Sequence, residues 1–258
     1  MASVIFWVFC GLLSCGAVPF LLPIFSKHRT RNYLGEEVPS SLGYAFLLPA
    51  ALMMAARGKT YEYAALFALA LSFFALLGTI DDVYGDRSIK GFGGHLGQRR
   101  STGAIKAWGG AAAALAISAQ LGSSGVELVV NGAIIALFAN LLNLLDVRPG
   151  RAGKVFLLLA LILLVLRPQI LAPLLGLIWA VAGYLPWDLR RVVLMGDVGS
   201  NPLGAALGLG FVLAFPALPF KIALALLLLG LNLLSERISF SKVIESNRFF
   251  HFLDQLGR

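Results

Sequence analysis

The feature that most constrains this chain is a series of long apolar stretches that follow one another from end to end. A helix needs about 20 apolar residues to cross a bilayer. The sequence is 59% hydrophobic and 13% charged, whereas soluble domains average about 45–50% and about 25%. These values predict an all-α polytopic membrane protein with about nine transmembrane helices, at residues 3–25, 42–57, 61–80, 103–121, 126–146, 153–167, 169–187, 202–218 and 219–235.

The same tiling predicts a single transmembrane domain over residues 1–258, of which residues 236–258 form a cytoplasmic tail. No basic segment precedes the first stretch, which is longer than the apolar part of a usual signal peptide, so we expect it to be retained. Cys10 and Cys15 both lie in that stretch, and we expect no disulfide between them.

Basic residues predict the orientation. If nine helices alternate in direction, 17 Lys and Arg side chains fall in one set of loops and 4 in the other. Because Lys and Arg concentrate in cytoplasmic loops, the N-terminus is expected outside and the C-terminus in the cytoplasm. Loops of this kind account for the net charge of +8, and we do not expect nucleic acid as a partner. The smaller set is Arg57, Lys59, Arg167 and Lys221.

Polar clusters fall on the expected cytoplasmic side. Asp81 and Asp82 end the third stretch, where two carboxylates oppose the helix dipole and repel each other. A divalent cation or basic partners would compensate them, and the alternative is the start of a solvated loop. Lys90 and Lys106 lie on the same side. Lys106 either reaches an anionic ligand or extends to the membrane interface.

Asn140, Asn143 and Asp146 end the fifth stretch at a spacing of three, so they share one helical face. Such groups usually face the protein interior or a water-filled cavity, although the asparagines could instead bond between helices. At the eighth stretch, Asn201 resembles an N-cap, with Pro202 at the first helical position. The free N–H groups there suit phosphate, provided that a metal ion separates it from Asp197; the alternative is an ordinary capped loop.

Four carboxylates and two lysines at one membrane face are what a magnesium–diphosphate site requires. No zinc-type His/Cys spacing and no Ser–His–Asp pattern is evident. The basic tail, with Arg248 and His251, either joins this site or rests on anionic lipid. The carboxylates are Asp81, Asp82, Asp146 and Asp197.

In order along the chain, these motifs resemble those of the polyprenyl-phosphate N-acetylhexosamine-1-phosphate transferases of glycosyltransferase family 4. The resemblance runs from about residue 27 to about residue 245. It rests on Asp81-Asp82, Thr102-Gly103 with Lys106, Asn140-Leu-Leu-Asn-Leu-Leu-Asp146 and Gly196-Asp-Val-Gly-Ser200, with Asn32-Tyr-Leu-Gly and Pro39 resembling the family's first cytoplasmic loop.

The resemblance implies that a sugar-1-phosphate is transferred from a UDP-sugar to a polyprenyl phosphate and that UMP leaves. It implies Mg²⁺ as cofactor. The implied partners are the lipid phosphate, the UDP-sugar and the membrane, with a homodimer as a further option. The implied catalytic residues are Asp81, Asp82 and Asp197, the metal ligands Asp197, Asp146 and Asp82, and the substrate-binding residues Lys90, Lys106, Asn140, Asn143, Asp146, Ser200, Asn201, Arg248 and His251.

The chain departs from the family pattern in three places. The loop after the asparagines reads Asp146-Val-Arg-Pro-Gly-Arg151, where the family has a second acid. Basic residues there hint at a more anionic donor. The tail holds one histidine, His251, in place of a histidine-rich motif, and it lacks a further span. A non-catalytic relative that binds polyprenyl phosphate or a cell-envelope enzyme is therefore the alternative. A transporter fits less well because its site would lie near the midplane.

Overall fold

The computed structural model describes residues 2–57, 59–84 and 102–258, although the side chains of residues 2–4 and 102–106 lie outside this description. The described part is all-α apart from one small antiparallel sheet, formed by β1 (Arg29–Arg31) and β2 (Glu37–Pro39). Its 12 helices are α1 (Ala2–Phe25), α2 (Tyr44–Ala56), α3 (Ala64–Tyr84), α5 (Thr102–Gln120), α6 (Gly125–Leu145), α7 (Arg151–Leu166), α8 (Pro168–Leu171), α9 (Leu174–Leu189), α10 (Asp197–Ala214), α11 (Leu218–Ser235), α12 (Phe240–Ser246) and α13 (Arg248–Gln255).

The prediction of nine transmembrane helices is wrong in number. Each predicted stretch coincides with a helix, but four helical segments in the described part are long and apolar enough to cross a membrane. Helix α2 has 13 residues, and α7 and α9 have 16 each, which is short of the span that a bilayer requires. The four candidates indicate a multi-pass membrane protein; they are Ile5–Phe25, Ala64–Tyr84, Gly125–Leu145 and Leu218–Ser235.

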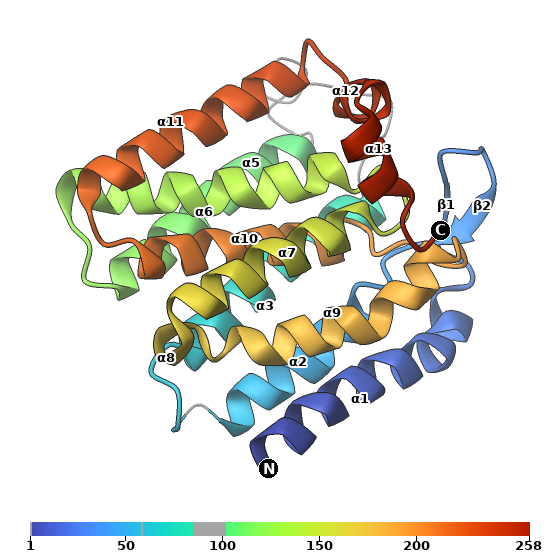
Figure 1. Cartoon of the computed structure of the whole chain (residues 1–258), viewed down its shortest axis with the longest axis horizontal. Helices are drawn as coiled ribbons and strands as arrows, with labels where there is room; N and C mark the ends of the chain where they lie inside the picture. Colours follow the sequence, from blue (N-terminus) through green and yellow to red (C-terminus); the bar gives the residue numbers. More distant parts are fainter. Residues whose placement is uncertain (1, 58, 85–101) are drawn as a thin grey trace.

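Helix α10 forms the centre of the bundle (Figure 1), and every residue from 198 to 210 is buried. It packs against α3, α6 and α7. Glycines let its backbone approach its neighbours closely, because a Cβ on Gly204 would clash with the backbone of Phe138 and one on Gly208 would lie 2.6 Å from the Cα of Ile135. The apolar sequence of α10 therefore serves protein packing.

Two groups of helices flank this centre (Figure 1). Helices α1, α2 and α9 pack together on one side, and α5, α6 and α11 on the other. Helix α11 is joined to α6 by an ion pair between Lys221 Nζ and Glu127 Oε1 at 2.8 Å. Cys10 and Cys15 are both free, as expected.

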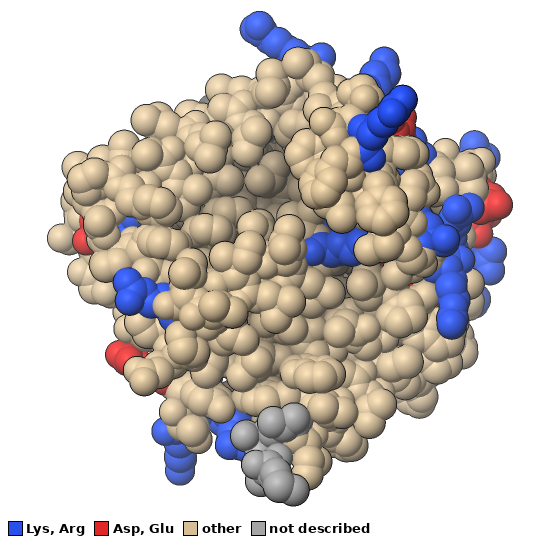
Figure 2. Space-filling model, viewed as in Figure 1, with Lys and Arg blue, Asp and Glu red and all other residues tan. Residues whose placement is uncertain are grey.

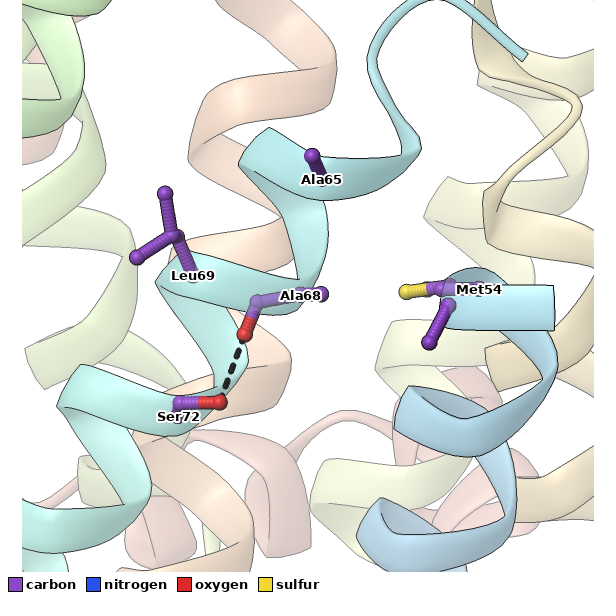
Figure 3. Close-up of a pocket in the computed structure, with 6 residues that line it drawn as sticks. Met54, Ala65, Ala68, Leu69 and Ser72 are labelled. Atoms are coloured by element: carbon purple, nitrogen blue, oxygen red, sulfur yellow. Dashed lines mark hydrogen bonds between the residues drawn. The ribbon is translucent and has the colours of Figure 1, made fainter. Parts of the chain in front are cut away.

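A cavity of about 360 Å³ lies between α2 and α3 (Figure 3). Ser72 is the one polar residue among those that line it, and its hydroxyl donates to the carbonyl of Ala68 within α3. The other lining side chains are apolar. The cavity lies beside the half of α3 that is remote from Asp81 and Asp82, and so it is separate from the polar clusters.

Candidate functional site

Asp82, near the end of α3, holds the beginning of α10. Its Oδ1 accepts a hydrogen bond from the backbone N–H of Asp197 at 3.1 Å, and its Oδ2 accepts one from Val198 at 3.2 Å. The hydroxyl of Ser41 donates to Oδ2 at 2.8 Å. A carboxylate at a helix N-terminus is stabilised by the dipole. The negative charge of Asp82 is unfavourable near the C-terminal end of α3, and the N–H groups at the start of α10 compensate it.

This arrangement corrects the predicted start of α10. The helix begins at Asp197, so Asn201 is not its N-cap and Pro202 lies inside it. The N-cap is Gly196, whose φ is +69°. A Cβ at Gly196 would stand 2.5 Å from Asp82 Oδ2, so both the backbone and the space require glycine. The sequence misplaced this boundary because the capping carboxylate comes from a distant helix.

The first two turns of α10 connect to α6 through side chains. Asn143 Nδ2 donates to Asp197 Oδ2 at 3.2 Å, and Ser200 Oγ donates to Asn143 Oδ1 at 3.2 Å. Asn201 Nδ2 donates to the backbone carbonyl of Asp197 at 3.0 Å. Hydrogen bonds thus connect four predicted site residues, Asp197, Asn143, Ser200 and Asn201, and Asn143 is the one bonded to the Asp197 carboxylate.

Asn140, in contrast, bonds away from this cluster. Its Nδ2 donates to Asn232 Oδ1 on α11 at 2.6 Å. The Nδ2 of Asn232 in turn donates to the carbonyls of Leu137 and Leu228. In the structure, Asn140 therefore makes the interhelical bond that was the alternative interpretation of the asparagines.

Asp146 follows the last residue of α6 and lies just beyond that candidate span. Burial, together with the negative charges of Asp188, Asp197 and Asp82, raises its pKa well above the ordinary value. Asp188 was not among the predicted residues. It is buried at the end of α9, and its Oδ2 accepts a hydrogen bond from the backbone N–H of Gly150 at 2.9 Å. The one feature of the sequence that could have indicated Asp188 is its position as an acidic residue directly after the apolar stretch 169–187.

The described residues contain no group of three Asp, Glu, His or Cys side chains arranged to hold a metal ion. The predicted set of Asp82, Asp146 and Asp197 is thus not a preformed cage. Mg²⁺ in phosphoryl-transfer sites is usually held by one or two carboxylates, several waters and the substrate phosphates. The oxygens of Asp197 and Asp146 fit that smaller requirement. Lys90 and the side chain of Lys106 lie outside the described residues.

The loop after α6 holds the C-terminal tail. Arg151, buried at the start of α7, donates from Nε and Nη2 to the two carboxylate oxygens of Asp254 at 2.8 and 2.9 Å. Its Nη1 donates to Ser241 at 2.8 Å. Arg258 also pairs with Asp254, and Lys154 Nζ donates to the carbonyls of Leu253, Asp254 and Leu256.

The charge of Asp254 is therefore compensated within the protein. Burial acts to raise the pKa of Asp254, but hydrogen bonds and charge from Arg151 and Arg258 outweigh it and lower the pKa below its ordinary value. Arg248 and His251 lie on α13 with exposed side chains.

Arg148 links three peripheral parts of the same face. Its Nη2 pairs with Glu245 of α12 at 2.7 Å, and its guanidinium lies 4.2 Å from the ring centroid of Tyr33, in the loop between β1 and β2. Figure 2 shows basic side chains gathered at the end of the molecule that carries the tail and the small sheet. These links were not predicted, because each joins residues that are far apart in sequence.

A known protein family matches the part of the chain that contains most of this site. The family described as Glycosyl transferase family 4 matches residues 64–215, which is more than half of the chain. A search of curated proteins gives no match. The matched range begins with α3 and ends just after α10, so it contains Asp82, Asp146, Asp188 and Asp197 and excludes the small sheet and the tail.

Proposed function

The chain belongs to glycosyl transferase family 4, a family of polyprenyl-phosphate sugar-1-phosphate transferases, and from this premise we propose that it transfers a sugar-1-phosphate from a UDP-sugar to a polyprenyl phosphate. The observation that carries the proposal is that Asp82 binds the backbone at the beginning of α10, while the charges of Asp82, Asp188 and Asp197 all act on Asp146. Carboxylates beside a helix N-terminus suit a bound diphosphate with its cation.

In the proposed reaction, an oxygen of the lipid phosphate attacks the phosphorus that bears the sugar. The bond from that phosphorus to the bridging oxygen breaks, and UMP leaves with the bond electrons. The lipid phosphate is already largely anionic at neutral pH, so Asp81 has mainly to position it. Phosphoryl transfer depends chiefly on such positioning and on charge neutralisation.

The residues of the cluster would divide the remaining work. Asp197 and Asp146 would hold magnesium, which when bound neutralises charge on the diphosphate. Asn143 fixes the rotamer of Asp197 through the bond to Oδ2. Asp82 acts through the backbone of α10, because its oxygens already accept three hydrogen bonds.

Basic and polar groups at the rim would receive the donor. By family resemblance, Lys90 and Lys106 meet phosphate, Ser200 and Asn201 support the diphosphate end, and Arg248 and His251 meet the nucleotide sugar. This rim is proposed to face the cytoplasm of a plasma membrane, where UDP-sugars are found. The positive excess at this end supports that orientation.

The alternative is a non-catalytic relative that binds polyprenyl phosphate or a cell-envelope enzyme. The observation that favours it is the single histidine, His251, where the family has a histidine-rich motif. All three guanidinium nitrogens of Arg151 bond within the protein, so Arg151 serves the tail and not a donor. The earlier hint of a more anionic donor loses its support for the same reason.

The experiment is UMP release by purified protein with undecaprenyl phosphate, Mg²⁺ and a panel of UDP-sugars. Asp197→Ala and addition of EDTA should each abolish release. Glu62→Gln is the matched control, because it removes an exposed acid from the connection between α2 and α3. Release that survives in Asp197→Ala contradicts the proposed role. No release from any donor by folded wild-type protein supports the non-catalytic relative.

A further inference from the structure

Helix α13 exposes an apolar face that the rest of the chain does not cover. At 100° per residue, Phe249, Phe250, Phe252 and Leu253 fall on one half of the helix. Their side chains are 65%, 51%, 62% and 39% exposed. The other half carries Arg248, His251, Asp254 and Gln255. Such a helix has two opposed surfaces, one apolar and one polar.

Polar groups, and not the apolar face, attach α13 to the bundle. Asp254 is 6% exposed and is held by Arg151 and Arg258. Lys154 binds three carbonyls at the end of the helix. The tail is therefore fixed in place while its phenylalanines point away from the protein. An apolar face held outward in this way is suited to an apolar environment outside the chain.

The position of α13 identifies that environment. The tail follows α11, one of the four candidate spans, after only a short connection. Figure 1 shows α12 and α13 at the end of the bundle where α11 finishes, running across the direction of the long helices. Ile238 and Val243, which lie between α11 and α13 in the sequence, are also exposed. A helix that lies across the spans at their end runs along the bilayer surface.

The charges of the tail indicate which kind of membrane surface it would bind. Glu245 is paired with Arg148, and Asp254 is paired with Arg151 and Arg258. Elsewhere in residues 236–258, the basic side chains Arg237, Lys242 and Arg248 outnumber the one further acid, Glu236. A basic segment beside a membrane span attracts anionic headgroups.

We propose that α12 and α13 form an interfacial anchor, in which the α13 phenylalanines enter the headgroup–acyl boundary of an anionic membrane while Arg237 and Lys242 meet lipid phosphates. The anchor goes beyond the transferase activity, since a binder of the same fold would use it equally. It would hold the loop after α6 at a fixed depth, because Arg151 and Arg148 connect that loop to the tail.

The test is spin labelling of the full-length protein in vesicles. Labels are placed singly at Phe249→Cys and Gln255→Cys in a Cys10→Ala, Cys15→Ala background, with gel filtration to verify folding. In phosphatidylcholine vesicles containing phosphatidylglycerol, collisions with a water-soluble nickel chelate should be several-fold rarer at position 249 than at 255, and collisions with oxygen more frequent. Equal access of the chelate at both positions overturns the anchor.

Two further measurements test whether a second copy of the chain covers the apolar face of α13 and whether lipid charge matters. Dipolar broadening between labels at position 249 would mean that a second copy covers the face, and it would overturn the proposal. Immersion at position 249 should be several-fold weaker without phosphatidylglycerol, and Arg237→Gln with Lys242→Gln should reproduce that loss. Immersion that is identical in both lipids overturns the selectivity for anionic headgroups.

Discussion

Asp254 carries the contacts that hold the end of the chain to the helices. Its carboxylate lies between two guanidinium groups, from Arg151 and Arg258, and all three side chains are less than 5% exposed. Removing one partner of a buried pair leaves the other charge without compensation, which costs far more than losing an exposed pair.

We expect Asp254→Asn to weaken tail docking by about 3–5 kcal/mol. Hydrogen exchange at the amides of α13 measures this opening directly. Glu245→Gln is the matched control, because it removes the partly exposed pair with Arg148, worth about 0–1 kcal/mol. Equal protection of α13 in the two variants would contradict the role given to Asp254.

The same carboxylate predicts how docking depends on pH. The folded pKa of Asp254 lies below its ordinary value of 3.8, because Arg151 and Arg258 favour the charged form over the effect of burial. A lowered pKa contributes stability that is full above the ordinary value and is lost as the pH falls through the folded one. Protease access to the tail should therefore be constant from pH 8 to about pH 5 and rise only below about pH 4.

Residue spacing within one helix can be read from the sequence, but the partners on other helices cannot. The spacing of Asn143 and Asp146 predicted one polar face of α6, and in the structure Asn143 donates to Asp197 of α10. Asp188 and the capping role of Asp82 were missed because each depends on a backbone N–H from another element, of Gly150 and of Asp197 respectively. Long-range capping leaves no local pattern in the sequence.

At the scale of elements, α10 is held at both its start and its middle by close backbone approach. A Cβ at Gly78 of α3 would clash with the backbone of Asp197, and backbone cannot rotate out of the way. Overpacking of this kind costs about 1–3 kcal/mol.

Gly78→Ala should accordingly lower thermal stability and reduce UMP release strongly, because it displaces the first turn of α10. Gly230→Ala serves as the control: a Cβ at that position in α11 meets nothing within 4 Å. Helix propensity alone would make it neutral or stabilising by up to about 1 kcal/mol. Similar losses in the two variants would mean that the damage is general to alanine at helical glycines.

Asn140 was predicted either to bind substrate or to bond between helices, and its contact with Asn232 of α11 allows the two to be distinguished. If this residue joins α6 to α11 through Asn232, Asn140→Ala should lower stability by about 0.6–2 kcal/mol, the range for hydrogen bonds between membrane helices, and leave UMP release close to wild type. Asn143→Ala should reduce UMP release strongly. A comparable loss of release in Asn140→Ala would return Asn140 to the substrate site.

Each predicted stretch coincides with a helix, but the predicted number of spans was wrong and α10 begins earlier than predicted. An apolar sequence indicates that a helix is shielded from water, but it does not show whether lipid or protein shields it. Helix α10 is apolar because it is surrounded by helices, whereas α11 exposes Leu226, Leu227 and Leu233. Hydropathy alone could not separate these two cases.

At the scale of the whole molecule, the two ends of the bundle differ in chemistry. One end holds the carboxylate cluster, the small sheet and the tail, and the other holds the connection between α2 and α3. We expect Glu62→Cys to react with a membrane-impermeant maleimide in intact cells and Gln255→Cys to react only after lysis, both in a background without Cys10 and Cys15. The reverse pattern would contradict the cytoplasmic site.

The central position of α10 has a consequence for how this protein can diversify. The helix that begins with Asp197 is enclosed on all sides over residues 198–210, so few substitutions along it are tolerable. The loop between β1 and β2 and helices α12 and α13 lie outside that packing, and Arg148 contacts both through Tyr33 and Glu245. Natural variation therefore has more freedom in these peripheral segments than along α10, whose enclosed residues constrain one another.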